Sequence, residues 1–344
     1  MNTRTTSLLA TLFLSVALAA CGGGGGSDAT QPPSQSSSLP PAPAPSAPAP
    51  APTPAAPVRV GIADAGFRQA LADQGVVVAA DGTVDSSAVA TVTTIDIEKD
   101  YGIVDLTGIS AFKGLTKLNV WNNPTLTNVT EVSTLTNLNW LGLYKGQFTS
   151  IDLSKLTGLT LLGVTEIVGL NTIDTSTLVN LTEFDVQADC DDPASPWGKT
   201  QGLTSLDVSK NVNLQSMDAA CQLFTSIDLS HNQQLNTLWL DGNANLTSLD
   251  LSHNPMLSSL TVYRDTNLSS LNLKGINGGN LPQRLSAYST PNLATITVTN
   301  PTQYNNWMNT ATMTSETQPD GTKDVMYTNG VTTMWIMLDA TFSN

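Results

Sequence analysis

Charge is what this sequence has least of. Only 12% of its 344 residues are charged, and 14 Lys and Arg stand against 28 Asp and Glu, giving a formal net charge of −14. Nucleic acids and anionic lipid surfaces are bound through concentrated basic patches. The composition therefore argues against nucleic acid as a partner and against membrane docking through a basic surface. Low charge with many Ser, Thr and Asn residues favours an extracytoplasmic protein.

Catalytic signatures are also missing. The sequence contains no G-x-S-x-G, H-E-x-x-H or C-x-x-C motif, and it has two histidines, His231 and His253. We therefore expect no enzymatic activity and no cofactor. A remote alternative is a glycan-active enzyme that would use Glu183 with Asp218 or Asp241 as its carboxylate pair.

A long hydrophobic run occurs only within the first twenty residues. It follows one arginine, is too short to span a membrane, and ends in Leu-Ala-Ala-Cys at residues 18–21. This resembles a bacterial lipoprotein signal, which implies a signal peptide over 1–20 and a lipid anchor on Cys21. Gly22 resembles an outer-membrane sorting signal. The alternative is an ordinary secretory signal cut near Ala20.

Residues 21–57 contain the only low-complexity segment. A Gly/Ser stretch is followed by alternating Pro and Ala, which favours an extended polyproline II chain. Such a composition cannot bury enough apolar surface to fold. We expect a disordered tether that holds a folded domain away from its membrane.

From residue 92 the apolar residues repeat as L-x-x-L-x-L with a period of about 22 residues. The units begin at Val92, Leu115, Leu138, Leu159, Leu181, Leu214, Leu235 and Leu257. This period is that of the leucine-rich repeat. We predict an α/β-type repeat solenoid dominated by β structure, with short parallel strands over 92–300. A helical N-terminal cap is expected over 58–91 and a β C-terminal cap over 301–344. Surplus residues near 190–202 and 276–291 predict two loops.

A nonapeptide recurs three times between these units, as residues 203–211, 224–232 and 246–254 (LTSLDLSHN in the last copy). Its asparagines, Asn211, Asn232 and Asn254, are expected to stack and to bind turn carbonyls and amides. Its aspartates, Asp207, Asp228 and Asp250, are expected to cap backbone N–H groups. Both histidines occupy a slot that Lys210 fills in the first copy, so we predict solvated side chains and no metal site.

The alternate half-repeats keep their leucines and vary everything between. Residues between buried strand positions point to the opposite face. That face carries large aromatics, which are favoured at interfaces and costly if left exposed. The predicted ligand-binding residues are Trp121, Trp140, Tyr144, Asp185, Trp239, Asp241 and Tyr263. Two alternatives stay open: the aromatics brace one another, or the concave and convex sides are exchanged.

Two cysteines remain, Cys190 and Cys221, at similar positions of neighbouring coils. Export implies an oxidising compartment, so we predict a disulfide that pins the 190–202 loop. The alternative is a pair of buried thiols.

The entry segment FRQALADQG, the LTSLDLSHN units and the exit segment LATITVTNPTQYNNW together resemble bacterial cell-surface leucine-rich repeat proteins, internalin-like in the broad sense. The resemblance implies a lipid-anchored exported protein, at the outer membrane or cell surface, that binds a protein or glycan as an adhesin or host-contact protein. The alternative is a periplasm-facing structural or envelope-interaction protein. Only Asp81 and Asp85 remain of the calcium loop seen in such entry segments, which is too few for calcium.

Overall fold

The computed structural model describes residues 56–188, 202–287 and 289–302, and the backbone of four strands between 312 and 343. The chain divides after Pro54, and the described residues belong to the second unit, Ala55–Asn344. Residues 1–20 and Cys21 lie outside the described residues, so the signal peptide and lipid anchor stay predictions. Among the residues that the structure describes, no helix has the length and apolar character needed to cross a membrane.

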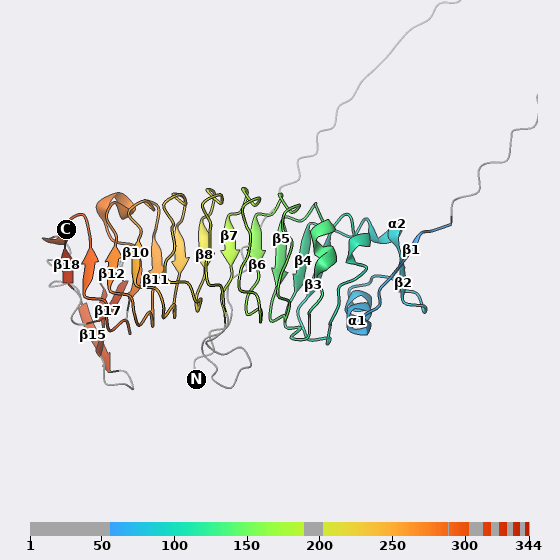
Figure 1. Cartoon of the computed structure of the whole chain (residues 1–344), viewed down its shortest axis with the longest axis horizontal. Coiled ribbons are helices and arrows are strands. Elements are labelled where there is room, and N and C mark those ends of the chain that lie inside the picture. The colour runs from blue at the N-terminus through green and yellow to red at the C-terminus, as the bar shows by residue number, and fades with distance from the viewer. Residues whose placement is uncertain are drawn as a thin grey trace, which may run out of the picture. The chain divides into compact units, whose positions relative to one another are not determined.

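The main feature is a sheet of 12 strands, here called the large sheet, in which successive coils pair side by side (Figure 1). Nine of these strands, all parallel to one another, are each supplied by one coil of the repeat. They are β3 (Thr94–Ile97), β4 (Lys117–Val120), β5 (Trp140–Leu143), β6 (Leu161–Gly163), β7 (Glu183–Asp185), β8 (Ser216–Asp218), β9 (Thr237–Trp239), β11 (Ser259–Thr261) and β13 (Arg284–Ala287). The variable half-repeats form these strands, and the predicted leucine-rich repeat solenoid is confirmed.

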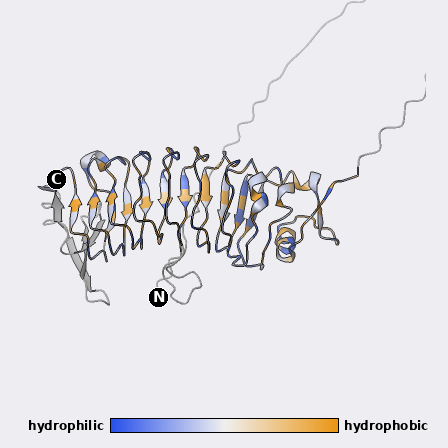
Figure 2. Cartoon of the chain, viewed as in Figure 1, coloured by the Kyte–Doolittle hydropathy of each residue, from blue (hydrophilic) through white to orange (hydrophobic). Residues whose placement is uncertain are grey.

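The core is a column of buried apolar side chains that runs the length of the solenoid. In Figure 2, the apolar residues appear as orange segments that recur from coil to coil. Each strand contributes one residue in register with its neighbours, and all of them are buried: Ile95, Leu118, Leu141, Leu162, Phe184, Met217, Leu238, Leu260 and Leu285. A single coil could not bury this face alone, so stacking supplies the core.

The nonapeptide half-repeats lie on the other side of this core. Their asparagines form the predicted ladder: Asn232 Nδ2 donates to the carbonyls of Val208 and Asn211 at 3.0 and 2.9 Å. Asn254 Nδ2 donates in the same way to Leu229 and Asn232, both at 2.9 Å. Towards the C-terminus the half-repeats also pair as strands, through β10 (Ser248–Asp250), β12 (Ser270–Asn272) and β14 (Thr295–Thr297).

A hairpin of β1 (Arg59–Gly61) and β2 (Thr83–Asp85) and the helices α1 (Ala65–Asp73) and α2 (Ser86–Val89) precede β3. Asp64 begins α1 by accepting the Phe67 N–H at 2.7 Å, and its other oxygen accepts the N–H of Val104 at 2.8 Å. At the far end of α1, Gln74 Oε1 accepts the Asp96 N–H on the edge strand β3 at 2.7 Å. The helix thus satisfies a donor that the sheet edge leaves unpaired.

The prediction of a loop over 276–291 is wrong for half of its length. Those residues contain β13, the next strand of the large sheet, preceded by a short 3-10 helix, η3 (Ile276–Gly279). The coil is only slightly longer than its neighbours, so the sheet continues without a break. Beyond it, β17 (Thr333–Met337) joins β13, and β15 (Thr312–Thr317) and β16 (Lys323–Thr328) extend the sheet antiparallel; β18 (Thr341–Ser343) pairs with β14.

Candidate functional site

The predicted binding residues lie on the outward face of the large sheet, opposite the core column. Trp140, Asp185 and Trp239 lie within strands. Trp121 and Tyr144 directly follow their strands, and Asp241 and Tyr263 lie two residues after theirs. The register places these positions in three rows that run across the coils. Six of the seven are partly exposed, and Tyr144 is only 7% exposed.

Three of the aromatics form one cluster over β4, β5 and β6. The ring centroids of Trp121 and Tyr144 are 4.9 Å apart with an interplanar angle of 34°. Trp140 and Tyr144 lie against Gly142: a Cβ at that position would come within 2.8 Å of the Trp140 ring and 2.5 Å of the Tyr144 ring. The Tyr144 ring also covers Gly163, where a Cβ would meet its ring carbon Cζ at 2.8 Å. The two glycines make a flat floor for the cluster.

Tyr144 supports this cluster instead of presenting a surface of its own. Burial raises the pKa of its phenol, so the ring stays neutral. Tyr144 thus packs among other aromatic residues, as the alternative interpretation expected. Trp121 and Trp140 contact it and are themselves partly exposed. The exposed part of the cluster is the two indole rings.

A lysine lies beside the same cluster. Lys117 Nζ is 4.8 Å from the Trp140 ring centroid and 2.5 Å from Asp96 Oδ2. Asn119 Nδ2 donates to the other Asp96 oxygen at 2.7 Å, while its own Oδ1 has no hydrogen-bond partner among the described residues. Asn119 is 8% exposed and lies in register with Gly142. An acceptor without a donor is thus buried at the edge of the aromatic cluster.

Carboxylates occupy the next part of the face. Glu183 and Asp185 lie on β7, Asp218 on β8, and Asp241 follows β9. Asp185 and Asp218 are direct neighbours in register. Burial raises the pKa of Asp185, opposed by the Gln187 N–H that its Oδ1 accepts at 3.2 Å. Asp218 and Asp241 also accept backbone N–H groups, from Ala220 and Tyr263, both at 3.0 Å.

The last two aromatics do not join the first cluster, and Trp239 lies in the same coil as Asp241. Trp239 lies on β9 and Tyr263 follows β11, separated from β5 by β6, β7 and β8. Arg264 stacks on the neighbouring Tyr263, with its guanidinium carbon 4.7 Å from the ring centroid. The face therefore has aromatic groups at both ends and carboxylates between them.

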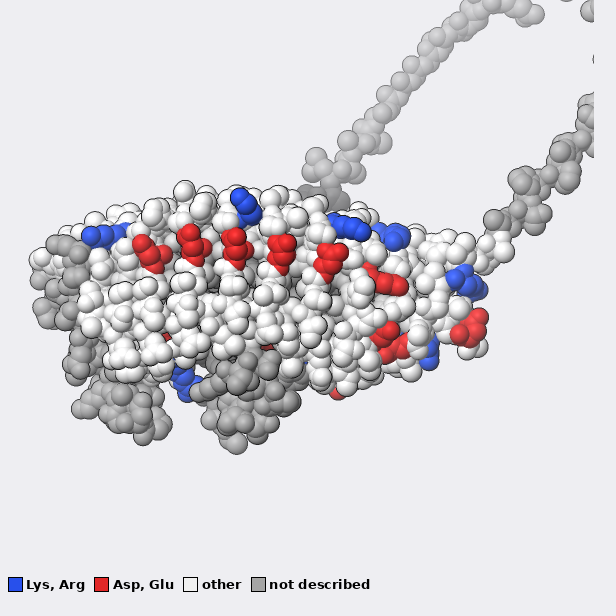
Figure 3. All heavy atoms as spheres, viewed as in Figure 1, with Lys and Arg blue, Asp and Glu red and all other residues white. Residues whose placement is uncertain are grey.

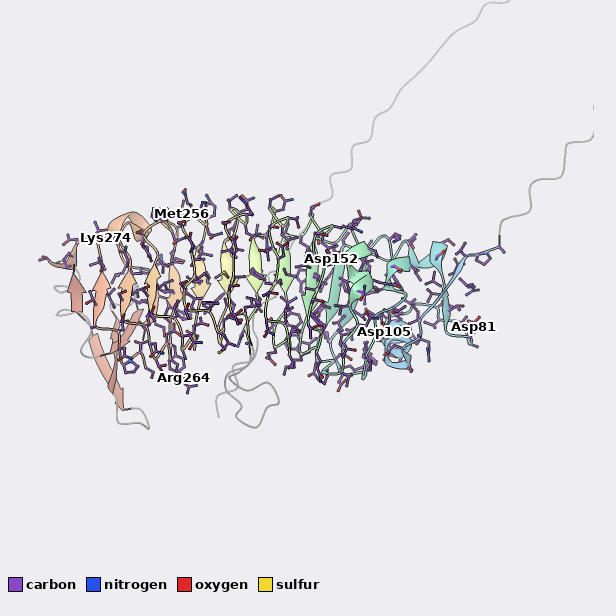
Figure 4. All side chains as sticks on the ribbon, viewed as in Figure 1. Asp81, Asp105, Asp152, Met256, Arg264 and Lys274 are labelled. Carbon is purple, nitrogen blue, oxygen red and sulfur yellow. The ribbon has the colours of Figure 1, made fainter. Side chains whose placement is uncertain are left out.

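Two or three residues after most of these strands, one residue has a left-handed backbone, which the sequence analysis did not find. The positions are Asn122, Lys145, Glu166, Cys221, Gly242, Arg264 and Ser289. Only one is glycine, so composition gave no signal. The turn sets these side chains at one edge of the solenoid, where Figure 4 shows Arg264. Lys145 Nζ and Glu166 Oε2, in adjacent coils, lie 3.5 Å apart there.

Only one of the two cysteines of the predicted disulfide, Cys221, lies among the described residues. Cys221 is disulfide-bonded, but Cys190 and most of the 190–202 loop lie outside the described residues, so the pairing stays a prediction. His231 and His253 are exposed, as expected of solvated positions. Within the described ranges, no group of three or more His, Cys, Asp or Glu side chains could hold a metal ion. Asp81 and Asp85 instead accept local N–H groups, from Thr83 and Ser87.

The opposite side of the solenoid carries a row of carboxylates (Figure 3). This aspartate row consists of Asp152, Asp174, Asp207, Asp228 and Asp250. In each, Oδ1 accepts the N–H of the serine two residues ahead at 2.9 to 3.0 Å. These bonds hold the pKa of Asp207 and Asp228 below the usual range. The predicted capping role is confirmed, and it recurs in coils without the nonapeptide.

Residues 86–189 match the family model of the leucine-rich repeat domain of the endo-beta-N-acetylglucosaminidase EndoS. The matched stretch runs from α2 to the end of the β7 coil and includes the aromatic cluster. With the stacked parallel strands, this match identifies the fold as a leucine-rich repeat solenoid. No curated protein matches the chain.

Several solved structures are similar to the chain. An internalin C2 from Listeria monocytogenes is 17% identical over 68% of this chain and 91% of its own, with a TM-score of 0.42. The leucine-rich repeat domain of the type III effector XopL is 16% identical over 67% and 83%, with a TM-score of 0.44. An internalin, InlF, from Listeria monocytogenes is 14% identical over 68% and 88%, with a TM-score of 0.32.

Proposed function

We propose that this protein is an exported, lipid-anchored leucine-rich repeat protein that binds a protein or glycan ligand through the outward face of the large sheet. The observation that carries the proposal is the aromatic cluster, in which Trp121 and Trp140 are partly exposed, Trp140 and Tyr144 lie against Gly142, and Trp121 packs on the Tyr144 ring. Partly exposed indole rings held rigidly lose little entropy on binding, which is why Trp is favoured at interfaces.

The fold supports binding over catalysis. Leucine-rich repeat solenoids present extended surfaces and are typical of protein-binding modules. The carboxylates of the remote catalytic alternative, Glu183, Asp218 and Asp241, come from three successive coils and three different rows of the face. Two of them already accept backbone hydrogen bonds that fix the strand ends. A binding surface accounts for this arrangement without a reacting group.

The test replaces Trp140 and Trp239 with Ala, singly and together, and compares binding on arrays of defined extracellular proteins and glycans. Both side chains are partly exposed, so the variants should keep the wild-type far-ultraviolet circular dichroism spectrum. The matched control is Met256→Ala, which removes a 57% exposed apolar side chain elsewhere. Unchanged ligand binding by a folded double variant would refute the proposed face.

The location of the domain has its own test. Under the lipoprotein proposal, Cys21 anchors the chain and residues 22–57 act as a tether. Protease added to intact cells should then release the folded domain if the protein is surface-exposed, as an adhesin or host-contact protein would be. Protection until the outer membrane is opened would favour the periplasm-facing alternative. A Cys21→Ser variant should lose membrane association in either case.

A further inference from the structure

The outward face of the large sheet has the chemistry of a receptor for a basic polypeptide. We infer that its ligand is an extended chain segment bearing Lys or Arg side chains, laid across the strands from β5 to β11. The inference rests on the proposed function, because it names the partner class of the same face. It commits to a polypeptide with cationic side chains and not to a neutral glycan.

The protein's own cations show how this face holds such a group. Lys117 Nζ lies 2.5 Å from the Asp96 carboxylate and 4.8 Å from the Trp140 ring centroid, so an ammonium is bound between a carboxylate and an indole ring. At the other end, the Arg264 guanidinium lies 4.7 Å from the Tyr263 ring centroid. A cation that lies over an aromatic ring and beside a carboxylate is attracted by both groups.

Between these two ends most charges are negative. From β6 to β9, the charged side chains in each strand and in the three residues after it are carboxylates: Glu166, Glu183, Asp185, Asp218 and Asp241. One of them, Glu166, pairs with Lys145 of the preceding coil at 3.5 Å. Asp218 and Asp241 each accept a backbone N–H at 3.0 Å, which holds their side chains in place on the face. Lys and Arg carry donors only, so they complement this part of the face.

The dimensions fit a short extended segment. From β5 to β11 there are five steps between neighbouring strands in the sheet order. At about 4.8 Å per step this distance is roughly 24 Å, which an extended chain of about seven residues covers. Basic side chains at alternate positions of such a segment would all point toward the face.

The test uses the full chain and three synthetic heptapeptides that alternate Ser with Lys, Gln or Glu, measured by isothermal titration calorimetry at low and physiological salt. The Lys peptide should bind, the Gln peptide should bind at least about tenfold more weakly, and the Glu peptide should not bind. Glu183→Gln with Asp218→Asn should weaken Lys-peptide binding by about tenfold or more. The single variant Glu183→Gln, at an exposed residue, serves if the double variant does not fold.

The matched control removes the same two charges from the aspartate row. Asp228→Asn with Asp250→Asn leaves side-chain acceptors in place and should change Lys-peptide affinity less than about twofold. Equal losses in both double variants would show non-specific attraction to an acidic protein and overturn the inference. Equal binding of Lys and Gln peptides, or binding of glycans alone in a manner that requires Trp140 and Trp239, would also overturn it while leaving the proposed function intact.

Discussion

Asp265 accepts the backbone N–H of Asn243 through Oδ1 at 2.6 Å, as Asn243 accepts that of Gln222 at 2.6 Å. The two residues occupy equivalent buried positions of successive coils, and both are 0% exposed. The Asn243 amide also donates to the carbonyls of Ala219 and Leu240, at 3.1 and 2.6 Å. Asp265 can replace that donor only when protonated, and its Oδ2 has no partner among the described residues. The carboxyl group of Asp265 thus occupies the position that the Asn243 amide occupies in the preceding coil.

This substitution makes stability depend on pH. Burial raises the pKa of Asp265 to about 9, from 3.8 for an unperturbed carboxyl, with a smaller contribution from the nearby Asp241 charge. Because the folded state binds the proton more tightly, stability from this group is complete below about pH 4 and is lost as the pH rises towards 9. Asp265→Asn should therefore increase the free energy of unfolding at pH 8 by about 2–4 kcal/mol, measured by urea denaturation.

The reciprocal variant is the control for that prediction. Asn243→Asp should introduce a second buried acid and lower stability at pH 8, with a much smaller effect at pH 4. A pH-independent effect of Asp265→Asn would contradict the protonated state, and a loss of stability at both pH values would show that the site needs the carboxyl group itself.

Asn232→Ala should cost about 2–3 kcal/mol in the free energy of unfolding. The substitution removes one of two donors from each of the Val208 and Asn211 carbonyls, which keep the backbone N–H groups of Asn211 and Leu214, and it breaks the side-chain link between the coils. His231→Ala, one residue away but exposed, should change stability by less than about 0.5 kcal/mol. Thermal unfolding of both variants checks the difference, and similar costs would refute the ladder's structural role.

Gly142→Ala should displace the aromatic rings without unfolding the coil. A Cβ there meets the far edges of Trp140 and Tyr144, which can move, at a cost of about 1–2 kcal/mol. We expect altered near-ultraviolet circular dichroism and weaker ligand binding. Gly61→Ala, where a Cβ meets nothing within 4 Å, is the matched control and should be silent. Unchanged aromatic spectra in Gly142→Ala would contradict the glycine floor.

The cysteine pairing predicts a defined cross-link. Peptide mapping without reduction should recover Cys190 and Cys221 in one linked fragment, and reduction should lower the free energy of unfolding by about 3 kcal/mol. A Cys221→Ala variant should show no effect of reduction. Alkylation of Cys190 in the unreduced protein would assign the Cys221 disulfide to another partner.

The repeat made most of the fold predictable from sequence. A 22-residue spacing of leucines fixes which residues are buried, and the agreement of Asn and Asp in each nonapeptide indicated the ladder and the caps that the structure contains. The prediction of a loop over 276–291 missed strand β13 because its sequence, R-L-S-A, lacks the usual leucine pattern. Its strand is recognised only by pairing with β11.

The sequence by itself determined the solenoid. Each repeat has one set of apolar residues, and repeats of the same length can all bury that set by stacking side by side. The tertiary structure alone decided what the outward residues do, since the contacts between coils join residues about 22 positions apart. It buried Tyr144 under its neighbours, separated the aromatics into two groups with carboxylates between them, and buried Asp265 at a position that raises the pKa of its carboxyl. The repeat period specifies which position of a strand each residue occupies. The contribution of its side chain to the free energy of folding depends on the neighbours that stacking provides.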